Sequence, residues 1–200
     1  MVPGIILAAG RSLRMGQPKA LLPYGTSGET FVGSLARALH DGGVDDVLVV
    51  GRREDHSLQA AVDALGIPAR YVENPAADGG QLTSVLAGLA VADRPGVRGI
   101  LVMPVDAPGI AGSTVAALLM AFRASAAPIA RAVHRGRHGH PVIFGREVFD
   151  ALRRTDLSLG ARAVVRAHGA AVLNVEVDDP AVLGDVDTPG DYQTLFGQEL

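Results

Sequence analysis

The fold of this chain is decided by residues 5–23, which read Ile5-Ile6-Leu7-Ala8-Ala9-Gly10-Arg11-Ser12-Leu13-Arg14-Met15-Gly16-Gln17-Pro18-Lys19-Ala20-Leu21-Leu22-Pro23. A short apolar run that ends at a glycine predicts a buried strand, and a loop with two glycines and three cations follows it. Gly10 and Gly16 allow tight turns that bring backbone N–H groups against a ligand, as a phosphate site requires. Arg14 can bind phosphate oxygens with both arms of its guanidinium, and Lys19 adds a mobile positive charge. The stretch therefore predicts a site for a phosphate-bearing ligand.

Two familiar phosphate loops do not fit this stretch. A P-loop needs Gly-Lys followed by Ser or Thr, whereas Lys19 stands between a proline and an alanine. The dinucleotide pattern G-x-G-x-x-G does not fit either, because Gly10 is followed by Arg11 and Ser12. The loop is therefore of a third kind. An ordinary surface loop with incidental basic residues is the alternative.

The composition of the 200 residues limits the class of protein. Hydrophobic residues make up 48% and charged residues 20%, which suits one globular domain. The net charge of −3 argues against a general nucleic-acid binder, whose surface would be basic. Since the sequence has no cysteine, a metal would need oxygen or imidazole ligands, which favours hard ions such as magnesium. No apolar run reaches the roughly 20 residues that span a bilayer and no signal-peptide pattern is found, so we expect a cytoplasmic protein.

Strand-like and helix-like segments alternate after the loop, as in a parallel α/β sheet. Strands are expected at 47–50, 69–72, 99–103 and 171–177, and helices at about 31–40, 55–65, 82–89, 113–124, 146–154 and 160–168. The very apolar run 99–103 should be a central strand. Residues 128–144 predict a hairpin at the edge of the sheet, and Thr188 should cap a last helix with Pro189 in its first turn.

Polar residues follow two of these strands at the edge of the sheet where ligands bind in such folds. Gly80 and Ser84 should face the same crevice as Gly10, unless they form an ordinary strand-to-helix turn. Asp106 follows the apolar run 99–103 and is well placed to hold a magnesium ion. The alternative for Asp106 is a cap of the next helix.

The hairpin at 128–144 carries several cations and histidines. Its three histidines do not have the spacing of a zinc signature, and no cysteine supports one. We therefore interpret its basic tip, with Arg137, as a clamp for a phosphate on a second substrate. A zinc site and a plain solvated hairpin are the alternatives.

Five motifs in this order resemble those of the molybdenum cofactor cytidylyltransferase branch of the MobA-like nucleotidyltransferase family. They are Leu-Ala-Ala-Gly-x-Ser-x-Arg-Met-Gly-x-x-Lys at 7–19, Asn-Pro with Gly and Ser at 74–84, Asp-x-Pro at 106–108, Gly-His-Pro-Val at 139–142 and Gly-Asp-Val-Asp-Thr-Pro at 184–189. Two positions depart from the family pattern. Val105 stands where a glycine usually precedes the aspartate, and the Gly-Asp usually found before Gly160-Ala161-Arg162 is missing, which leaves the role of Arg162 open.

The resemblance implies a single-domain Rossmann-like nucleotidyltransferase fold, with a mostly parallel mixed sheet flanked by helices. Residues 1–110 would bind the nucleotide, and residues 111–200 would bind the acceptor and supply a closing metal motif. The implied nucleotide-binding residues are Leu7, Ala8, Ala9, Gly10, Ser12, Arg14, Gly16, Lys19, Gly80 and Ser84. Arg14, Lys19 and Asp106 would be catalytic.

The same resemblance assigns residues to the acceptor and the metal. His140 and Pro141 join Arg137 as expected acceptor contacts. Asp187 would be the partner of Asp106 in binding Mg²⁺, unless it serves only the N-terminus of the last helix, where a carboxylate is favourable.

The expected reaction is transfer of CMP from CTP onto the phosphate of molybdopterin, with release of pyrophosphate. Such a phosphate is largely ionised at pH 7, so no general base is needed, and catalysis consists of alignment and charge neutralisation. Ala8-Ala9-Gly10, in place of Ala-Gly-Gly, resembles the cytidine-using branch. The alternatives are a guanylyltransferase using GTP, a sugar- or polyol-phosphate nucleotidyltransferase, and a carrier without catalysis. We expect no nucleic-acid or membrane partner, and a molybdoenzyme would receive the product.

Overall fold

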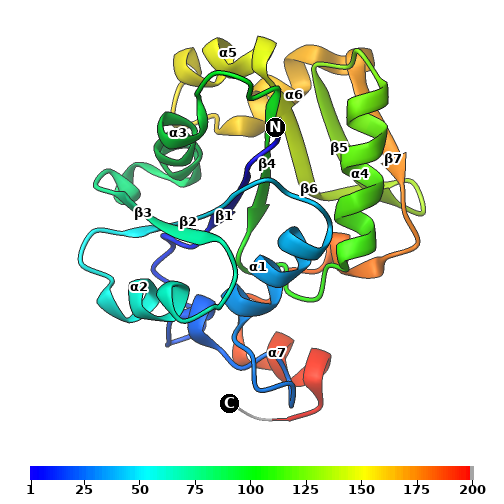
Figure 1. The fold of residues 1–200 in the computed structure, drawn as a ribbon. Helices are drawn as coiled ribbons and strands as arrows, with labels where there is room; N and C mark the ends of the chain where they lie inside the picture. The colour runs from blue at the N-terminus through cyan, green and yellow to red at the C-terminus, as the bar shows by residue number, and fades with distance from the viewer. Residues whose placement is uncertain (199–200) are drawn as a thin grey trace.

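A sheet of seven strands runs through the centre of residues 1–198, the part of the chain that the computed structural model describes (Figure 1). The strands are β1 (Gly4–Leu7), β2 (Val47–Arg52), β3 (Ala69–Asn74), β4 (Gly99–Pro104), β5 (Ile129–His134), β6 (Arg137–Gly145) and β7 (Val172–Glu176). They lie in the order β3-β2-β1-β4-β6-β5-β7. Within this sheet only β6 runs opposite to the others, since it is antiparallel to both β4 and β5. The predicted mostly parallel mixed sheet is therefore confirmed.

Helices cover both faces of the sheet (Figure 1). They are α1 (Phe31–Asp41), α2 (His56–Asp63), α3 (Gln81–Ala92), α4 (Gly112–Ala124), α5 (Phe149–Arg154), α6 (Ala161–His168) and α7 (Pro189–Phe196). Successive strand residues point to opposite faces. Ile6 and Val49 accordingly pack with α1, α2, α4 and α7, whereas Ile5 and Val50 pack with α3, α5 and α6.

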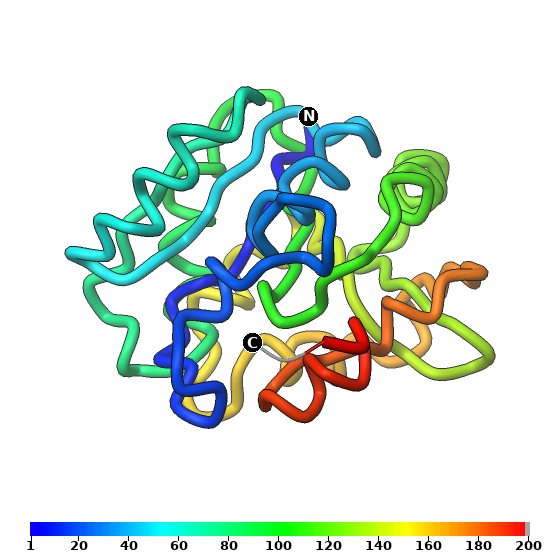
Figure 2. The backbone as a smooth tube through the Cα atoms, turned by 90° about the horizontal axis from the view of Figure 1, so that it is seen from below, coloured from blue at the N-terminus to red at the C-terminus, as the bar shows by residue number. Residues whose placement is uncertain are grey.

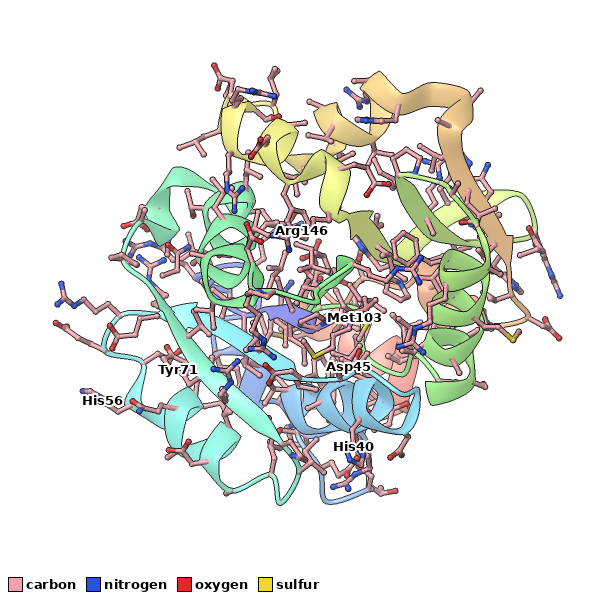
Figure 3. The ribbon with its side chains drawn as sticks, turned by 45° about the horizontal axis from the view of Figure 1, so that its top comes forward. His40, Asp45, His56, Tyr71, Met103 and Arg146 are labelled. Carbon is pink, nitrogen blue, oxygen red and sulfur yellow. The ribbon has the colours of Figure 1, made fainter. Side chains whose placement is uncertain are left out.

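Strand β4 lies at the centre of the sheet, as its apolar sequence predicted. All six of its residues are buried, because helices cover both faces and β1 and β6 flank it. Met103 of β4 lies among closely packed side chains in the middle of the molecule (Figure 3). The strand therefore holds the segment that follows it, residues 105–108, in a fixed place at the edge of the sheet.

The predicted cap of the last helix is also confirmed, and a second threonine caps α1. The Thr30 hydroxyl accepts a hydrogen bond from the Gly33 backbone N–H at the start of α1. At the start of α7, Thr188 and Asp191 form a reciprocal capping box, in which each side chain accepts a hydrogen bond from the other residue's backbone N–H. Such caps satisfy N–H groups that a helix leaves unpaired, so these helix starts are set by local sequence.

The expectation that the hairpin lies at the edge of the sheet is wrong. Strands β5 and β6 are interior strands, and the edges are β3 and β7. The hairpin resembles an edge because only residues 142–145 of β6 pair with β4. Residues 137–141 lie beyond the part of β6 that pairs with β4, and the first two of them are exposed. Strand β3 also continues to Asn74, two residues beyond its predicted end.

The ends of β1 and β4 point to the lower side of the molecule in Figure 1, and Figure 2 shows it from that side. Ligands bind at this edge in open α/β sheets. The loop after β1, the start of α3, the segment after β4 and the segment before α7 all reach it. In residues 1–198 no helix combines the length and apolar character that crossing a membrane requires.

Candidate active site

A cavity of about 520 Å³ lies at the ends of β1 and β4. Its walls come from residues 7–14 and 18–21, from Asp55, from four residues at and before the start of α3, from residues 104–106, and from Asp187. All predicted nucleotide-binding residues except Gly16 line this cavity. The structure therefore brings segments that are far apart in the sequence to one place.

Ser12 organises the loop that follows β1. Its backbone carbonyl accepts hydrogen bonds from the N–H groups of Met15 and Gly16, and its hydroxyl accepts one from the N–H of Lys19 at 3.2 Å. The left-handed conformations in this loop are at Ser12 (φ 51°) and Gly16 (φ 79°). The expected tight turn at Gly10 is thus a turn at Ser12 and Gly16. A Cβ atom on Gly10 would have no heavy atom within 4 Å, so its missing side chain keeps the cavity open.

Lys19 connects the two aspartates that the sequence proposes as metal ligands. Its Nζ lies 2.5 Å from Asp187 Oδ1 and 3.4 Å from Asp106 Oδ2, and the side chain is buried. Arg14 Nη2 contacts the other oxygen of Asp187 at 2.8 Å. The hydrogen bond from Lys19, with a smaller contribution from Arg14, lowers the pKa of Asp187, so this carboxylate stays ionised at neutral pH.

Backbone contacts hold Asp106 and Asp187 beside each other. The N–H of Val186 donates to the carbonyl of Asp106 at 2.8 Å, and the N–H of Asp187 donates to Asp191 Oδ2 at 3.0 Å. Neither candidate ligand is a helix cap. Thr188 is the cap of α7, and the backbone at the start of α4 is bound by Asp179, which accepts hydrogen bonds from Ala111 N–H and the Thr114 hydroxyl.

Asp106 and Asp187 offer the oxygen ligands that a magnesium ion prefers, and Mg²⁺ commonly uses one or two carboxylates together with substrate phosphates. Over residues 1–198 no group of three or more histidine, aspartate or glutamate side chains has metal-binding geometry, so the zinc alternative receives no support. His40 and His56 lie at the periphery of the molecule in Figure 3, and His134 is buried with its Nδ1 beside the carbonyl of Val177.

The sequence did not predict a group of charged residues beside the loop. Asp78 binds Arg11 through two hydrogen bonds and Arg52 through one of 2.7 Å, and these contacts lower the pKa of Asp78 to about 2. Arg52 also donates to the carbonyl of Ala9 at 3.2 Å. The group ties the loop after β1 to the segment before α3. No local pattern in the sequence signals this group, because Arg52 lies two residues beyond the predicted strand 47–50 and an isolated arginine has many possible partners.

A buried polar network supports the start of α3. Asn74 Nδ2 donates to Thr83 Oγ1 at 2.9 Å and to Ser84 Oγ at 3.0 Å, and the Thr83 hydroxyl donates to the carbonyl of Gly80. Ser84 lines the cavity but is almost fully buried, so it is not the solvated hydroxyl of an ordinary turn. Asn74, which ends β3, therefore shapes the wall at Gly80, whose φ is 96°.

The structure does not bring the three expected acceptor residues to this cavity. Arg137 is exposed at the start of β6, Pro141 is buried within the strand, and neither lines the cavity. His140 has a buried Nδ1 without a hydrogen-bond partner in the described chain. Burial lowers the pKa of His140, the charge of Arg162 lowers it further, and Asp106 opposes both. His140 and Arg162 thus lie within electrostatic reach of the aspartates.

Asp185 is a further acidic residue that the sequence did not single out. Partial burial, with the negative charges of Asp106 and Asp187, raises the pKa of Asp185, and Lys19 and Arg162 oppose that rise. Its position two residues before Asp187 could have suggested it, since alternate residues of an extended segment share a side.

Comparison with known proteins identifies the family. The MobA-like NTP transferase domain matches residues 4–172, most of the chain. The chain belongs to this family. Nicotine blue oxidoreductase of Paenarthrobacter nicotinovorans is 34% identical, covering 94% of this chain and 92% of the relative. The purine catabolism protein PucB of Bacillus subtilis is 33% identical, covering 96% and 94%. A probable molybdenum cofactor guanylyltransferase of Rhodopirellula baltica is 35% identical over 61% of this chain and 56% of its own length.

Solved structures agree with this family. Rv0371c of Mycobacterium tuberculosis superposes with a TM-score of 0.82 at 30% identity, over 99% of both chains. A second structure of Rv0371c, in complex with manganese, gives a TM-score of 0.74 at 29% identity over 98% of both chains. Rv0371c therefore shares the whole fold with this chain, and one of its structures contains manganese.

Proposed function

We propose that this protein transfers CMP from CTP to the phosphate of molybdopterin and releases pyrophosphate. The observation that carries the proposal is the position of Lys19, buried between Asp106 and Asp187 beneath a loop that presents Arg14 to the same cavity. In this proposal, residues 1–110 bind the nucleotide and residues 111–200 bind the acceptor and supply Asp187. In this proposal, the residues that line the cavity are the nucleotide-binding and catalytic residues that the family resemblance implies.

In the reaction, an oxygen of the acceptor phosphate attacks the α-phosphorus of CTP and forms a new P–O bond. The bond from the α-phosphorus to the bridging oxygen breaks, and pyrophosphate leaves with that electron pair. Lys19, Arg14 and the loop N–H groups hold the triphosphate and balance the charge that moves onto pyrophosphate. Asp106 and Asp187 would hold a magnesium ion, whose charge would neutralise the phosphates when it is bound.

The choice of CTP rests on Ala9, which lines the cavity and has its carbonyl held by Arg52. A methyl group at this position reduces the room for a guanine. The relatives named guanylyltransferase make GTP the strongest alternative nucleotide. Replacing Ala9 by glycine should increase turnover with GTP relative to CTP. An unchanged preference would contradict the role of Ala9.

Two relatives match this chain over nearly their whole length but are named as other kinds of protein. One is named an oxidoreductase, and the other a purine catabolism protein. The paired charges of this cavity favour transfer of a phosphate-bearing group. A molybdenum cofactor transferase could support an oxidoreductase or a purine-degrading enzyme by supplying its cofactor, so a molybdoenzyme is the proposed recipient of the product.

The test has two steps. Calorimetric titration with magnesium and CTP, GTP, ATP or UTP measures which triphosphate binds, and CTP should bind most tightly. Pyrophosphate release is then measured with each triphosphate and molybdopterin, with Lys19→Ala as the inactive control. Binding without pyrophosphate release would identify a carrier, and a preference for GTP would identify a guanylyltransferase. No binding of any triphosphate would overturn the enzyme proposal.

A further inference from the structure

A second cavity, of about 540 Å³, adjoins the first. It lies between the start of α3 and the segment 157–162 that leads into α6, and Arg166 of α6 also lines it. Gly80 and Gln81 border both cavities, so they form the wall between them. A ligand in the second cavity would therefore lie next to whatever occupies the first.

The second cavity has two positive charges that pair with no acidic side chain of residues 1–198. Arg162 and Arg166 are four residues apart on α6 and so lie on the same side of the helix. Both are exposed, and within residues 1–198 neither forms an ion pair or a side-chain hydrogen bond. Asp78 is the acidic residue in this wall, and Arg11 and Arg52 already bind it. The cavity therefore presents net positive charge to a ligand.

Apolar side chains stand beside these arginines. Leu157 is 45% exposed and Leu159 is 63% exposed, and both line the cavity. Leu82, which is buried, forms part of the floor. Exposed leucines beside two cations suit a ligand that has a flat apolar or aromatic part and a negative charge, since one group covers the leucines while the other binds the arginines.

The second cavity lies next to the reacting groups of the first. Gly80 and Gln81 border both cavities, and Arg162 lines the second while Lys19 and Asp106 line the first. Arg137, by contrast, lies at the far end of β6 beyond the hairpin turn, and it lines neither of these two cavities.

We propose that the second cavity is the acceptor subsite, in which Arg162 binds the attacking phosphate and Arg166 binds a further negative group. Leu157 and Leu159 would cover the planar ring of an anionic heteroaromatic acceptor. This inference rests on the proposed nucleotidyl transfer and moves the acceptor contacts from the hairpin, with Arg137, to the start of α6. It also gives a role to Arg162, which the sequence left open.

The experiment compares Arg162→Ala and Arg166→Ala with the wild type, with Arg154→Ala as the matched control. Arg154 is an exposed arginine at the end of α5, the helix before this segment, and it lines neither cavity. Initial rates are measured with Mg·CTP and molybdopterin. We expect Arg162→Ala to raise the KM for molybdopterin about 10- to 100-fold, because a charged hydrogen bond is lost, while the KM for CTP is unchanged. Arg166→Ala should have a smaller effect in the same direction.

A second measurement separates failure of this inference from failure of the proposed function. Binding of molybdopterin alone is followed by its pterin fluorescence, which does not require turnover. Weaker binding to Arg162→Ala and Arg166→Ala than to Arg154→Ala would support the subsite even if another nucleotide is the true donor. Unchanged binding and unchanged KM in both variants would overturn it. If Arg137→Ala alone weakened binding, the acceptor would belong to the hairpin instead.

Discussion

The two cavities differ in how their charges are balanced. In the first, Lys19 and Arg14 are paired with Asp106 and Asp187 by contacts between segments far apart in the sequence. In the second, Arg162 and Arg166 have no acidic partner in the described chain, and one short segment with α6 supplies most of the wall. The first cavity therefore has its charged groups fixed before a ligand arrives, while the second depends on the ligand to balance its charge. Loss of a group from the first should reduce the rate of reaction, and loss from the second should reduce affinity.

The largest expected effect comes from removing the central cation of the first cavity. Lys19→Ala should lower turnover about 100- to 1,000-fold, because a charge that stabilises the transition state is lost. Asp106 and Asp187 would also face each other without a cation between them. Lys19→Arg, which keeps the charge, is the comparison variant. Near-normal turnover of a folded Lys19→Ala protein would contradict the assigned role.

Removing the buried side chain of Asn74 tests whether the wall between the cavities depends on its polar network. Asn74→Ala should lower the free energy of unfolding by about 1–3 kcal/mol, because the buried Thr83 and Ser84 hydroxyls lose a partner. Denaturant unfolding measures this change. Asn174→Ala, at an exposed asparagine of β7, is the matched control and should have little effect. Equal losses in the two variants would show that the network does not matter.

A smaller effect is expected from replacing Arg52, which binds the loop that follows β1. Arg52→Ala removes the hydrogen bond to the Ala9 carbonyl and one of the contacts to Asp78. The KM for CTP should rise about three- to tenfold, since partly exposed contacts of this kind are modest. The neighbouring exposed arginine provides the control variant Arg53→Ala. A similar KM in both variants would mean that the loop keeps its shape without Arg52.

The smallest effect concerns pH and the exposed carboxylate of Asp78. Its pKa is about 2 in the folded protein and 3.8 in an ordinary aspartate, so its ionised form favours folding. That contribution is fully present above pH 3.8 and is lost as the pH falls toward 2. Asp78→Asn should therefore lower Tm by about 1 °C at pH 7, and the difference from wild type should disappear toward pH 2. Asp63→Asn, at an exposed aspartate of α2, should show no such difference.

The sequence predicted those features that depend on neighbours in the chain. The apolar run 99–103 predicted a central strand, and Thr188 with Pro189 predicted the start of α7, because burial pattern and capping are local. The nearness of Lys19 and Asp187 depends on contacts between residues 168 positions apart, and only the family resemblance suggested it.

Other features carried no local pattern at all. Whether a hairpin is at the edge or inside a sheet depends on the strand that pairs with it last, and β7 comes later in the chain. The contacts of Asp78 with Arg11 and Arg52 could not be predicted, since an isolated arginine in a sequence has many possible partners. The second cavity arises only when the segment 157–162 folds over α3.

The burial of Lys19 between two carboxylates has a consequence for the chemistry of the whole chain. Lys19 is the only lysine among the 200 residues. A reagent that acylates amines therefore has a single side-chain target, and that target is buried and in contact with Asp106 and Asp187. The extent of labelling at Lys19, read by mass spectrometry, would thus report directly how often the centre of this cavity opens.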